Sequence, residues 1–213
     1  MIEIKRFVCN MLQENTYVMS DETREAVIID CGAFFDAERD ALLNYLEHQQ
    51  LKPVHLLSTH GHFDHNFGND TIWSHYGLKP EVPAEDEAMM DLKKQVEDML
   101  GTTYPREVPP IGKLLSTDDV IMFGTHKLTI LATPGHTRGS VTYYCPEEGI
   151  AFTGDTLFRM SIGRTDFPGG SWALMMGSLR LLSTLPANTK VYAGHGEPTT
   201  IGDELKYNPY MSH

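Results

Sequence analysis

The chain has 213 residues, of which 41% are hydrophobic and 22% are charged, and its formal net charge is -12. This length can bury a substantial core in one large domain or two small ones, and the composition is typical of a globular protein. The acidic balance argues against a groove that follows nucleic-acid phosphates and against binding to anionic membranes, so we expect neither kind of partner.

The N-terminus and the cysteines predict a cytoplasmic protein. Residues 1–7 alternate apolar and charged side chains and lack the apolar centre of a signal peptide, and no long apolar span follows. Cys9, Cys31 and Cys145 are odd in number and far apart, which predicts reduced and mostly buried thiols. We expect Cys31 to be a small packed residue.

The first part of the chain alternates strands and helices. Apolar runs predict strands at 2–8, 15–20, 26–30 and 54–58. Helices are expected at 36–49, where apolar residues share one face, and at 66–76, where Gly77 is a suitable stop.

The second part begins with a helical pattern and continues with strands. Met89, Leu92, Val96 and Met99 recur at helical spacing, which predicts a helix over 84–100 with the methionines in the core. The glycine- and proline-rich stretches 101–117 and 158–170 predict loops. Further elements are expected in this order: strands at 120–123, 127–132, 140–145 and 149–153, a helix at 172–184 with Trp172 inward, a strand at 190–193, and a short last helix capped by Thr200.

Two stretches of the chain repeat one order of elements. Residues 26–62 run from a strand that ends in Asp30 through a helix and a second strand to a pair of histidines. Residues 149–195 run from a strand that ends before Asp155 through a helix and a strand to His195. The repeat predicts an α/β fold of two similar layers of sheet and helix, packed face to face with their loops at one edge.

Side chains that can bind a metal are most concentrated in the segment Thr59-His60-Gly61-His62-Phe63-Asp64-His65. This segment follows the apolar run 54–58, so it is the loop at a strand's carboxyl end, where open α/β layers bind their ligands. A loop can fold all four groups around a cation, whereas one helix face or strand face cannot. Neutral imidazoles and a carboxylate suit zinc, and they also suit iron or manganese.

Three more candidate ligands occupy the same kind of position. His136, Asp155 and His195 each lie at or just past a strand end, next to glycine. Glycine allows the backbone to turn sharply and to approach an ion closely. Seven ligands are too many for one tetrahedral zinc, but they suit two metal ions that share a bridging carboxylate and a water.

The segments THGHFDH, TPGHT, TGDTLF and GHG, in this order, resemble the metallo-β-lactamase superfamily over nearly the whole chain. The resemblance implies a single domain over residues 1–213 with a four-layer αββα sandwich, that is, two mixed sheets with helices outside. It also divides the ligands between two ions. His60, His62 and His136 would hold one metal, Asp64, His65 and His195 the second, and Asp155 would bridge them.

Within the superfamily the chain most resembles the glyoxalase II group, through residues 155–158 and 162–170. This resemblance implies hydrolysis of acyl thioesters such as S-D-lactoylglutathione by a metal-bridging hydroxide, with two divalent ions, zinc first and iron or manganese as alternatives. Asp64 would also orient the hydroxide, and Arg164 matches a basic residue that faces the substrate. The chain ends at His213, without the full C-terminal helical domain that holds glutathione in the longer enzymes. Glutathione recognition and oligomeric state therefore stay open.

Several residues have competing interpretations. Arg164 either contacts substrate or pairs with Asp166 or Asp155 and shapes its loop. Asp30 is either a turn residue or an acid that hydrogen-bonds the ligand loop, and we favour the second role because ligand loops need outside support. The histidines outside the motifs are assigned to the core, to structural contacts or to solvent: His48, His55, His75, His126 and His213.

An alternative function is a mononuclear iron oxidoreductase, because relatives of the same group oxidise a glutathione persulfide with a single iron. The intact ligands Asp64, His65 and His195 weigh against that alternative. A non-catalytic binding module should have lost ligands, and none is lost here. A nuclease of this superfamily would carry an inserted domain and a basic groove, and a β-lactamase would be exported.

Overall fold

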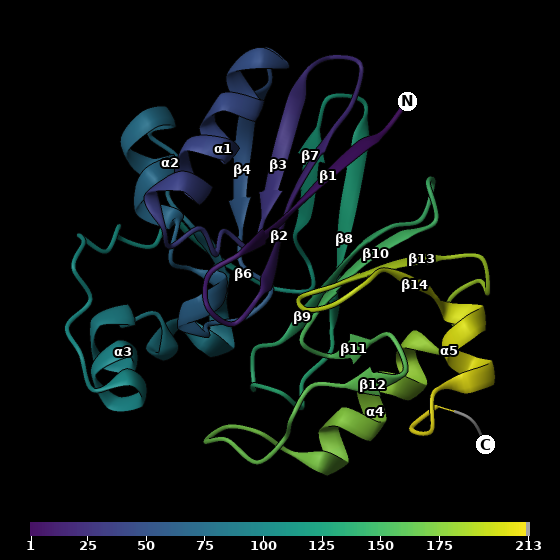
Figure 1. Cartoon of the computed structure of the whole chain (residues 1–213). Helices are drawn as coiled ribbons and strands as arrows, with labels where there is room; N and C mark the ends of the chain where they lie inside the picture. Colours follow the sequence, from purple (N-terminus) through teal and green to yellow (C-terminus); the bar gives the residue numbers. More distant parts are fainter. Residues whose placement is uncertain (212–213) are drawn as a thin grey trace.

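Two six-stranded mixed sheets face each other in this computed structural model, which describes residues 1–211 (Figure 1). The first sheet has the order β1 (Glu3–Cys9), β2 (Glu14–Ser20), β3 (Glu25–Ile29), β4 (Lys52–Leu57), β5 (Glu81–Pro83) and β6 (Lys113–Leu115). The second has the order β14 (Thr199–Thr200), β13 (Lys190–Ala193), β10 (Ile150–Gly154), β9 (Val141–Cys145), β8 (His126–Ala132) and β7 (Val120–Phe123). A small hairpin, β11 (Leu157–Phe158) and β12 (Ser161–Ile162), follows β10.

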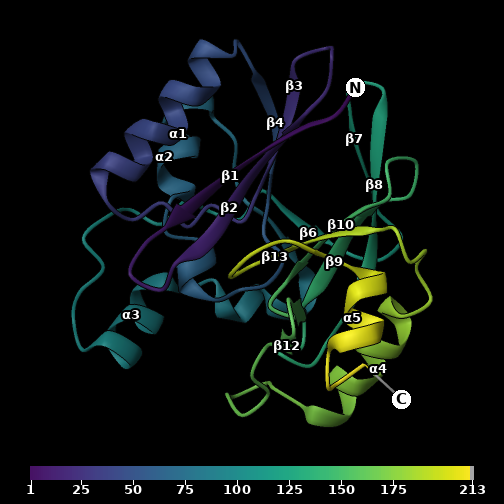
Figure 2. The same ribbon diagram turned by 45° about the vertical axis from the view of Figure 1, so that its right-hand side comes forward.

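Helices cover the outer face of each sheet, as Figures 1 and 2 show. α1 (Asp36–His48) and α2 (Asn69–Tyr76) pack on the first sheet through a cluster that includes Leu42, Leu46 and Ile72. α4 (Trp172–Leu182) and α5 (Ile201–Tyr207) pack on the second sheet through a cluster that includes Met175, Leu179 and Ile201. This arrangement confirms the predicted αββα sandwich. None of the helices within residues 1–211 is both long and apolar enough to cross a membrane.

Alternation along the strands explains why the layers form. In β2, Tyr17 and Met19 enter the core between the sheets, whereas Val18 between them faces the helices. In β3, Ile29 enters the core between the sheets and Ile28 faces the helices. Successive strand residues point to opposite faces, so strands that are apolar on both faces must be covered on both. Full burial of each such side chain contributes about 1.5–3 kcal/mol.

The predicted internal repeat is present in the structure. β3 and β4 are parallel neighbours on either side of α1 in the sequence, and β10 and β13 are parallel neighbours on either side of α4. The carboxyl ends of parallel strands lie at one edge of their sheet. Each pair therefore delivers its loops to the same edge, which brings the segments after β3, β4, β10 and β13 together.

The prediction of one continuous helix over 84–100 is wrong, because the helix is interrupted in its middle. A 3-10 helix, η2 (Ala84–Met89), is followed by a separate helix α3 (Leu92–Leu100). The break occurs because the Asp91 side chain accepts a hydrogen bond from the backbone N–H of Lys94 and caps a new helix. Leu92 and Val96 are buried as expected, but Met99 is 50% exposed, because α3 is covered on one side only.

Smaller differences follow from short elements that periodicity does not detect. The stretches 101–117 and 158–170 contain β6 and β12, and the helix expected at 66–76 begins at Asn69, after the 3-10 turn η1 (Phe63–His65). Trp172 was expected to point inward but is 53% exposed, because it lies at the first position of α4, where its ring packs edge-on against Tyr210. All three cysteine thiols are buried, and Cys31 packs under α1 and α2, as predicted.

Candidate metal centre

The seven predicted ligands converge at the shared edge of the two sheets. Ligand atoms of His60, His62 and His136 lie within 4.8 Å of one another, and those of Asp64, His65 and His195 do the same. We call these sets the first and second ligand groups. The grouping is the same as the division that the resemblance implied.

Asp155 lies between the two groups. Its Oδ2 atom is 3.4 Å from Nε2 of His136 in the first group and 3.6 Å from Nε2 of His195 in the second. Its Oδ1 atom is 3.4 Å from Nε2 of His65. One carboxylate thus faces both groups, which is the position that a bridging ligand requires.

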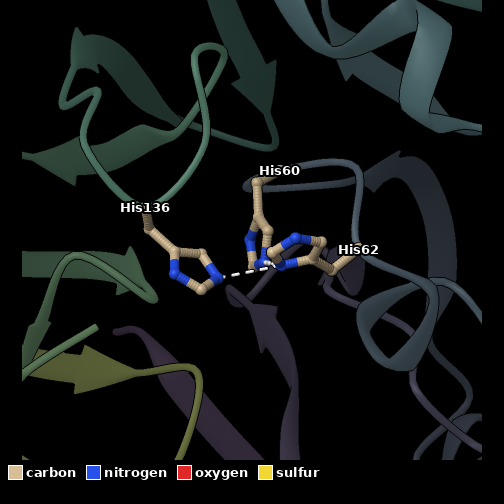
Figure 3. A group of neighbouring side chains, drawn as sticks. All are labelled: His60, His62 and His136. Atoms are coloured by element: carbon tan, nitrogen blue, oxygen red, sulfur yellow. Dashed lines mark hydrogen bonds between the residues drawn. The ribbon is translucent and has the colours of Figure 1, made fainter. Parts of the chain in front are cut away.

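In the first group, ring nitrogens face one another (Figure 3). Nδ1 of His62 is 3.1 Å from Nε2 of His60 and 2.9 Å from Nε2 of His136. The Thr59 hydroxyl donates its hydrogen to Asp30, so it accepts from Nδ1–H of His60, and Nδ1–H of His136 donates to the Arg164 carbonyl oxygen. Both Nε2 atoms therefore present lone pairs to His62. A proton on His62 can satisfy one of these contacts, whereas a cation satisfies all three nitrogens.

The second group is oriented in the same manner. Nδ1 of His65 lies 3.0 Å from the Asp30 carboxylate, and Nδ1 of His195 lies 3.1 Å from the carbonyl oxygen of Leu12. Each Nδ1 therefore carries the proton, and each Nε2 is free to bind a metal. Asp64 completes the group, with Oδ2 3.4 Å from Nε2 of His195 and 3.6 Å from Nε2 of His65.

Two buried atoms support the fit of a metal ion to this site. Within residues 1–211, Nε2 of His65 and Oδ1 of Asp155 are buried without a hydrogen-bond partner. Leaving such atoms unpaired is costly in a folded protein, and coordination to a cation removes the cost. The set of imidazole nitrogens and carboxylate oxygens suits zinc, iron or manganese.

The protonation states of His60, His62 and Asp155 also suit metal binding. Burial lowers the pKa of His62 to about 4 and holds the pKa of His60 well below its ordinary value, so both rings are neutral near pH 7. Burial raises the pKa of Asp155, but the neighbouring His65, His136 and His195 outweigh it and hold that pKa well below the ordinary value. The carboxylate is therefore ionised, as a ligand must be.

Asp30 supports both ligand groups through hydrogen bonds. Its carboxylate accepts from the backbone N–H and the hydroxyl of Thr59, at 2.7 and 2.8 Å, and from Nδ1 of His65. Thr59 in turn contacts Nδ1 of His60. The predicted hydrogen bonding of Asp30 to the ligand loop is confirmed.

Asp86, which the sequence pattern does not identify, ties together the two loops of the first group. Its fully buried carboxylate accepts from the backbone N–H of Gly61, between His60 and His62, at 3.0 Å. It also accepts from the Thr137 hydroxyl at 2.6 Å and from the backbone N–H of Gly139 at 2.7 Å, next to His136. An acid inside an expected helix gives no signal of this role in the sequence.

Two asparagines that were also missed hold the ligand loop. Nδ2 of Asn66 donates to the carbonyl oxygens of His60 and His62, and Nδ2 of Asn10 donates to the carbonyl oxygen of Asp64. Asn66 directly follows the motif, and this adjacency is the signal that could have identified it. Asn10 lies in the connection between β1 and β2, far away in sequence, and has no such signal.

A close approach at Gly194 brings the second sheet's loop to the site. A Cβ atom at this position would collide with Oδ1 of Asp155 and come within 2.7 Å of the His65 ring. Only glycine leaves enough space here for Asp155 and His65 to lie beside the backbone that leads to His195.

Arg164 lies at the rim of the site and is paired. Its guanidinium donates two hydrogen bonds to Asp166, at 2.8 and 2.7 Å, and lies 3.5 Å from the centre of the Phe167 ring. It lines a cavity of about 340 Å³ together with Asp64, His136, Asp155 and His195. The pairing with Asp166 corresponds to the structural alternative, and substrate contact by Arg164 stays a prediction.

The remaining histidines lie outside the metal-binding groups. His55 contacts Glu81 and the carbonyl oxygen of Met122, and His126 contacts Asp21 and Glu148. Nδ1 of His48 and of His75 each bonds a backbone oxygen of its own helix. These contacts agree with their assigned structural roles, and His213 lies outside the described residues.

Comparison with known proteins gives matches over nearly the whole chain. The family profile described as "Metallo-beta-lactamase superfamily" matches residues 10–195. The hydroxyacylglutathione hydrolase GloC of Haemophilus influenzae is 33% identical over 203 residues, which cover 94% of this chain and 93% of that protein.

Solved structures share the fold and much of the length. BLEG-1 B3 metallo-beta-lactamase matches with a TM-score of 0.89 and 32% identity, over 99% of this chain and 100% of the other. TTHA1623, solved in a di-iron-bound form, matches with a TM-score of 0.85 and 32% identity, over 97% and 99%. ETHE1 from Myxococcus xanthus matches with a TM-score of 0.77 and 27% identity, over 97% and 83%.

Proposed function

The chain belongs to the metallo-beta-lactamase superfamily, and within it we propose that this protein is a dinuclear hydrolase of acyl thioesters. One observation carries the proposal: seven ligand side chains converge with unshared lone pairs facing one another, and five of them line an open cavity. The similarity to a hydroxyacylglutathione hydrolase over 94% of the chain supports the choice of thioesters.

The metal ions would be held by the two ligand groups, with Asp155 facing both. Divalent cations bound there supply Lewis acidity and lower the pKa of water, so that hydroxide is present near neutral pH. Zinc is our first assignment, with iron or manganese as alternatives. A cytoplasmic location agrees with three buried, unpaired thiols, which a reducing compartment preserves.

Asp64 is the residue that we assign to orienting the nucleophile. Burial raises its pKa, but His65 and His195 outweigh this effect and lower the pKa below the ordinary value, so the carboxylate is ionised at neutral pH. An ionised carboxylate that lines the cavity can accept a hydrogen bond from water and direct its lone pair at an acyl carbon. The departing thiolate is a good leaving group and needs little protonation.

Arg164 lies at the rim of the cavity. From there it would stabilise the negative charge that develops on the acyl oxygen, or bind an anionic arm of the substrate. Its bidentate pair with Asp166 reduces the positive charge that it offers, so we assign it a secondary role in binding.

The test begins with metal analysis of the purified protein, followed by hydrolysis assays with S-D-lactoylglutathione and with a neutral acyl thioester. We expect two metal ions per chain and hydrolysis of at least one substrate. Absence of turnover with both thioesters at full dinuclear occupancy would reject the proposal.

The alternative is a mononuclear iron oxidoreductase of the persulfide dioxygenase kind. Two observations favour it: the first ligand group alone offers three imidazole nitrogens to a single ion, and the chain is similar to ETHE1. One iron per chain, with oxygen uptake in the presence of glutathione persulfide and without thioester hydrolysis, would establish it instead.

A further inference from the structure

A second cavity adjoins the metal site. It has a volume of about 450 Å³ and lies between α3 and the loop that leads from β12 to α4. Figures 1 and 2 show this loop extending from the second half of the chain toward α3. Its apolar wall consists of Ala88, Met89, Met99, Phe167 and Pro168.

The two cavities adjoin each other. His62, Met99 and Phe167 line both the metal-site cavity and the second one. The ring of Phe167 also packs edge-on against His62, with centroids 6.1 Å apart. The second cavity therefore lies next to the place where the reacting carbon of a substrate would lie over the ligand groups.

The polar groups of this second cavity already have partners. Asp91 caps α3, and Lys94 pairs with Asp98. Nε2 of Gln95 donates to the carbonyl oxygen of Gly61 at 2.8 Å. These four side chains each have a partner within the chain, and most of the surface that lines the cavity is apolar, which favours an apolar ligand.

The charges of the wall argue against an anionic occupant. One cation, Lys94, lies among two carboxylates, Asp91 and Asp98, so the wall is acidic on balance. The next cation along the path, Arg164, is paired with Asp166. Glutathione carries two carboxylates, and it would bring like charge to this wall.

We infer that the second cavity is a binding site for an uncharged, apolar arm of the thioester, with Met99 and Phe167 as its entrance. This inference rests on the proposed function for the identity of the reacting group. Methionine is unbranched and flexible, so walls that contain Met89 and Met99 can adapt to alkyl chains of different length. The apolar arm can belong either to the acyl group or to the thiol carrier of the thioester.

Two matched substrate series test the inference on the metal-loaded protein. In one, the acyl group lengthens from acetyl to octanoyl on N-acetylcysteamine; in the other, the acyl group stays acetyl and the thiol lengthens from ethanethiol to octanethiol. We expect kcat/KM to rise about three- to fourfold per methylene group in one series, and the series that rises identifies the arm. A flat response in both series would overturn the inference while leaving the proposed hydrolase intact.

Substitutions test whether the dependence of kcat/KM on chain length arises in the second cavity. Met99→Glu, at an exposed position that tolerates charge, should abolish the dependence on chain length. Met122→Glu is the matched control, because Met122 is equally exposed but lies on β7, and it should retain the dependence. Asp98→Asn frees Lys94 and should raise the preference for an acylglutathione over the neutral thioester of the same acyl group. An unchanged length dependence in Met99→Glu would contradict the inference.

Binding separates this inference from failure of the proposed function. If the wild type hydrolyses no thioester, non-hydrolysable S-alkyl-N-acetylcysteamines of two to eight carbons are titrated calorimetrically into the metal-loaded protein. A Kd that falls with chain length in the wild type and the Met122→Glu variant, but not in Met99→Glu, supports the apolar site although the hydrolase proposal fails. No binding, or binding independent of length, overturns the inference as well.

Discussion

The two ligand groups of the candidate metal centre differ in how their loops are held, although each has two buried members and one partly exposed member. In the first group, His60 and His136 are 0% and 4% exposed, and Asp86 ties their loops together. In the second group, the side chain of His195 is 25% exposed, and its Nδ1 is held by main-chain oxygens of the β1–β2 connection. We therefore expect an ion in the first group to be bound more tightly than an ion in the second group.

The largest expected effect comes from breaking each group in turn. His136→Ala removes an enclosed ligand from the first group, and we expect loss of both metal and turnover well beyond the 10- to 100-fold that loss of a supporting residue costs. His195→Ala should leave the first group intact and retain one metal per chain. Metal analysis after gel filtration checks this, and equal metal content in the two variants would contradict the proposed asymmetry.

Asp86→Ala is the next strongest test, because it cuts the tie between the two loops of the first group without touching a ligand. We expect metal affinity and kcat to fall about 10- to 100-fold. Glu85→Ala is the matched control, since Glu85 is an exposed acid on the same 3-10 helix. A loss of similar size in both variants would show that the effect comes from the helix and not from the carboxylate of Asp86.

Asp30→Asn should have a moderate effect that falls on both groups. The change keeps the size of the side chain and one acceptor, but it weakens the hydrogen bonds to Thr59 and to His65. We expect about a tenfold loss of metal affinity with a smaller change in thermal stability. Metal content equal to that of the wild type, measured over a series of chelator concentrations, would remove the supporting role of Asp30.

Arg164→Ala should change little. Its guanidinium is exposed and paired with Asp166, and exposed ion pairs have weak energetic effects. We expect KM for an anionic thioester to rise by less than about fivefold, and KM for a neutral thioester to stay the same. A large loss of kcat with both substrates would instead place Arg164 at the reacting atoms.

Acidification should release the two metal ions one at a time. Burial lowers the pKa of His195, but Asp64 and Asp155 outweigh it and raise that pKa above the ordinary value of 6.5, whereas burial lowers the pKa of His62 to about 4. Burial also lowers the pKa of His65, but the neighbouring carboxylates outweigh it and raise that pKa well above its ordinary value, whereas the pKa of His60 lies well below it. Protons compete with metal for each nitrogen, so as pH falls the second group is protonated before the first. We expect metal content to fall from two to one per chain before the second ion is lost at lower pH. In His195→Ala the first step should be missing, and a single-step release in the wild type would argue against this order.

The sequence predicted the layers and the seven converging side chains well, because both leave local marks. Alternating apolar residues predict strands, and histidines or aspartates flanked by glycine at strand ends predict a shared edge. Asp86 was missed because the pairing of β4 with β5 brings Gly61 to it and the packing of the two sheets brings Thr137 to it, and neither contact leaves a local mark in the sequence. Met99 and Trp172 were misplaced because helical spacing identifies an apolar face without showing whether anything covers it.

The position of the ligands on both sheets has a consequence for the thermal behaviour of the protein. Metal binds the native chain and not the dispersed residues of an unfolded one, so occupancy raises the free energy of unfolding by mass action, by about 4 kcal/mol when free metal is a thousand times its Kd. His60 follows β4 of one sheet and His136 follows β8 of the other, and in the second group His65 and His195 divide in the same way. An ion in either ligand group would therefore be a removable cross-link between the two halves of the sandwich. The melting temperature should therefore report free metal concentration, and trace chelators in a buffer will lower it.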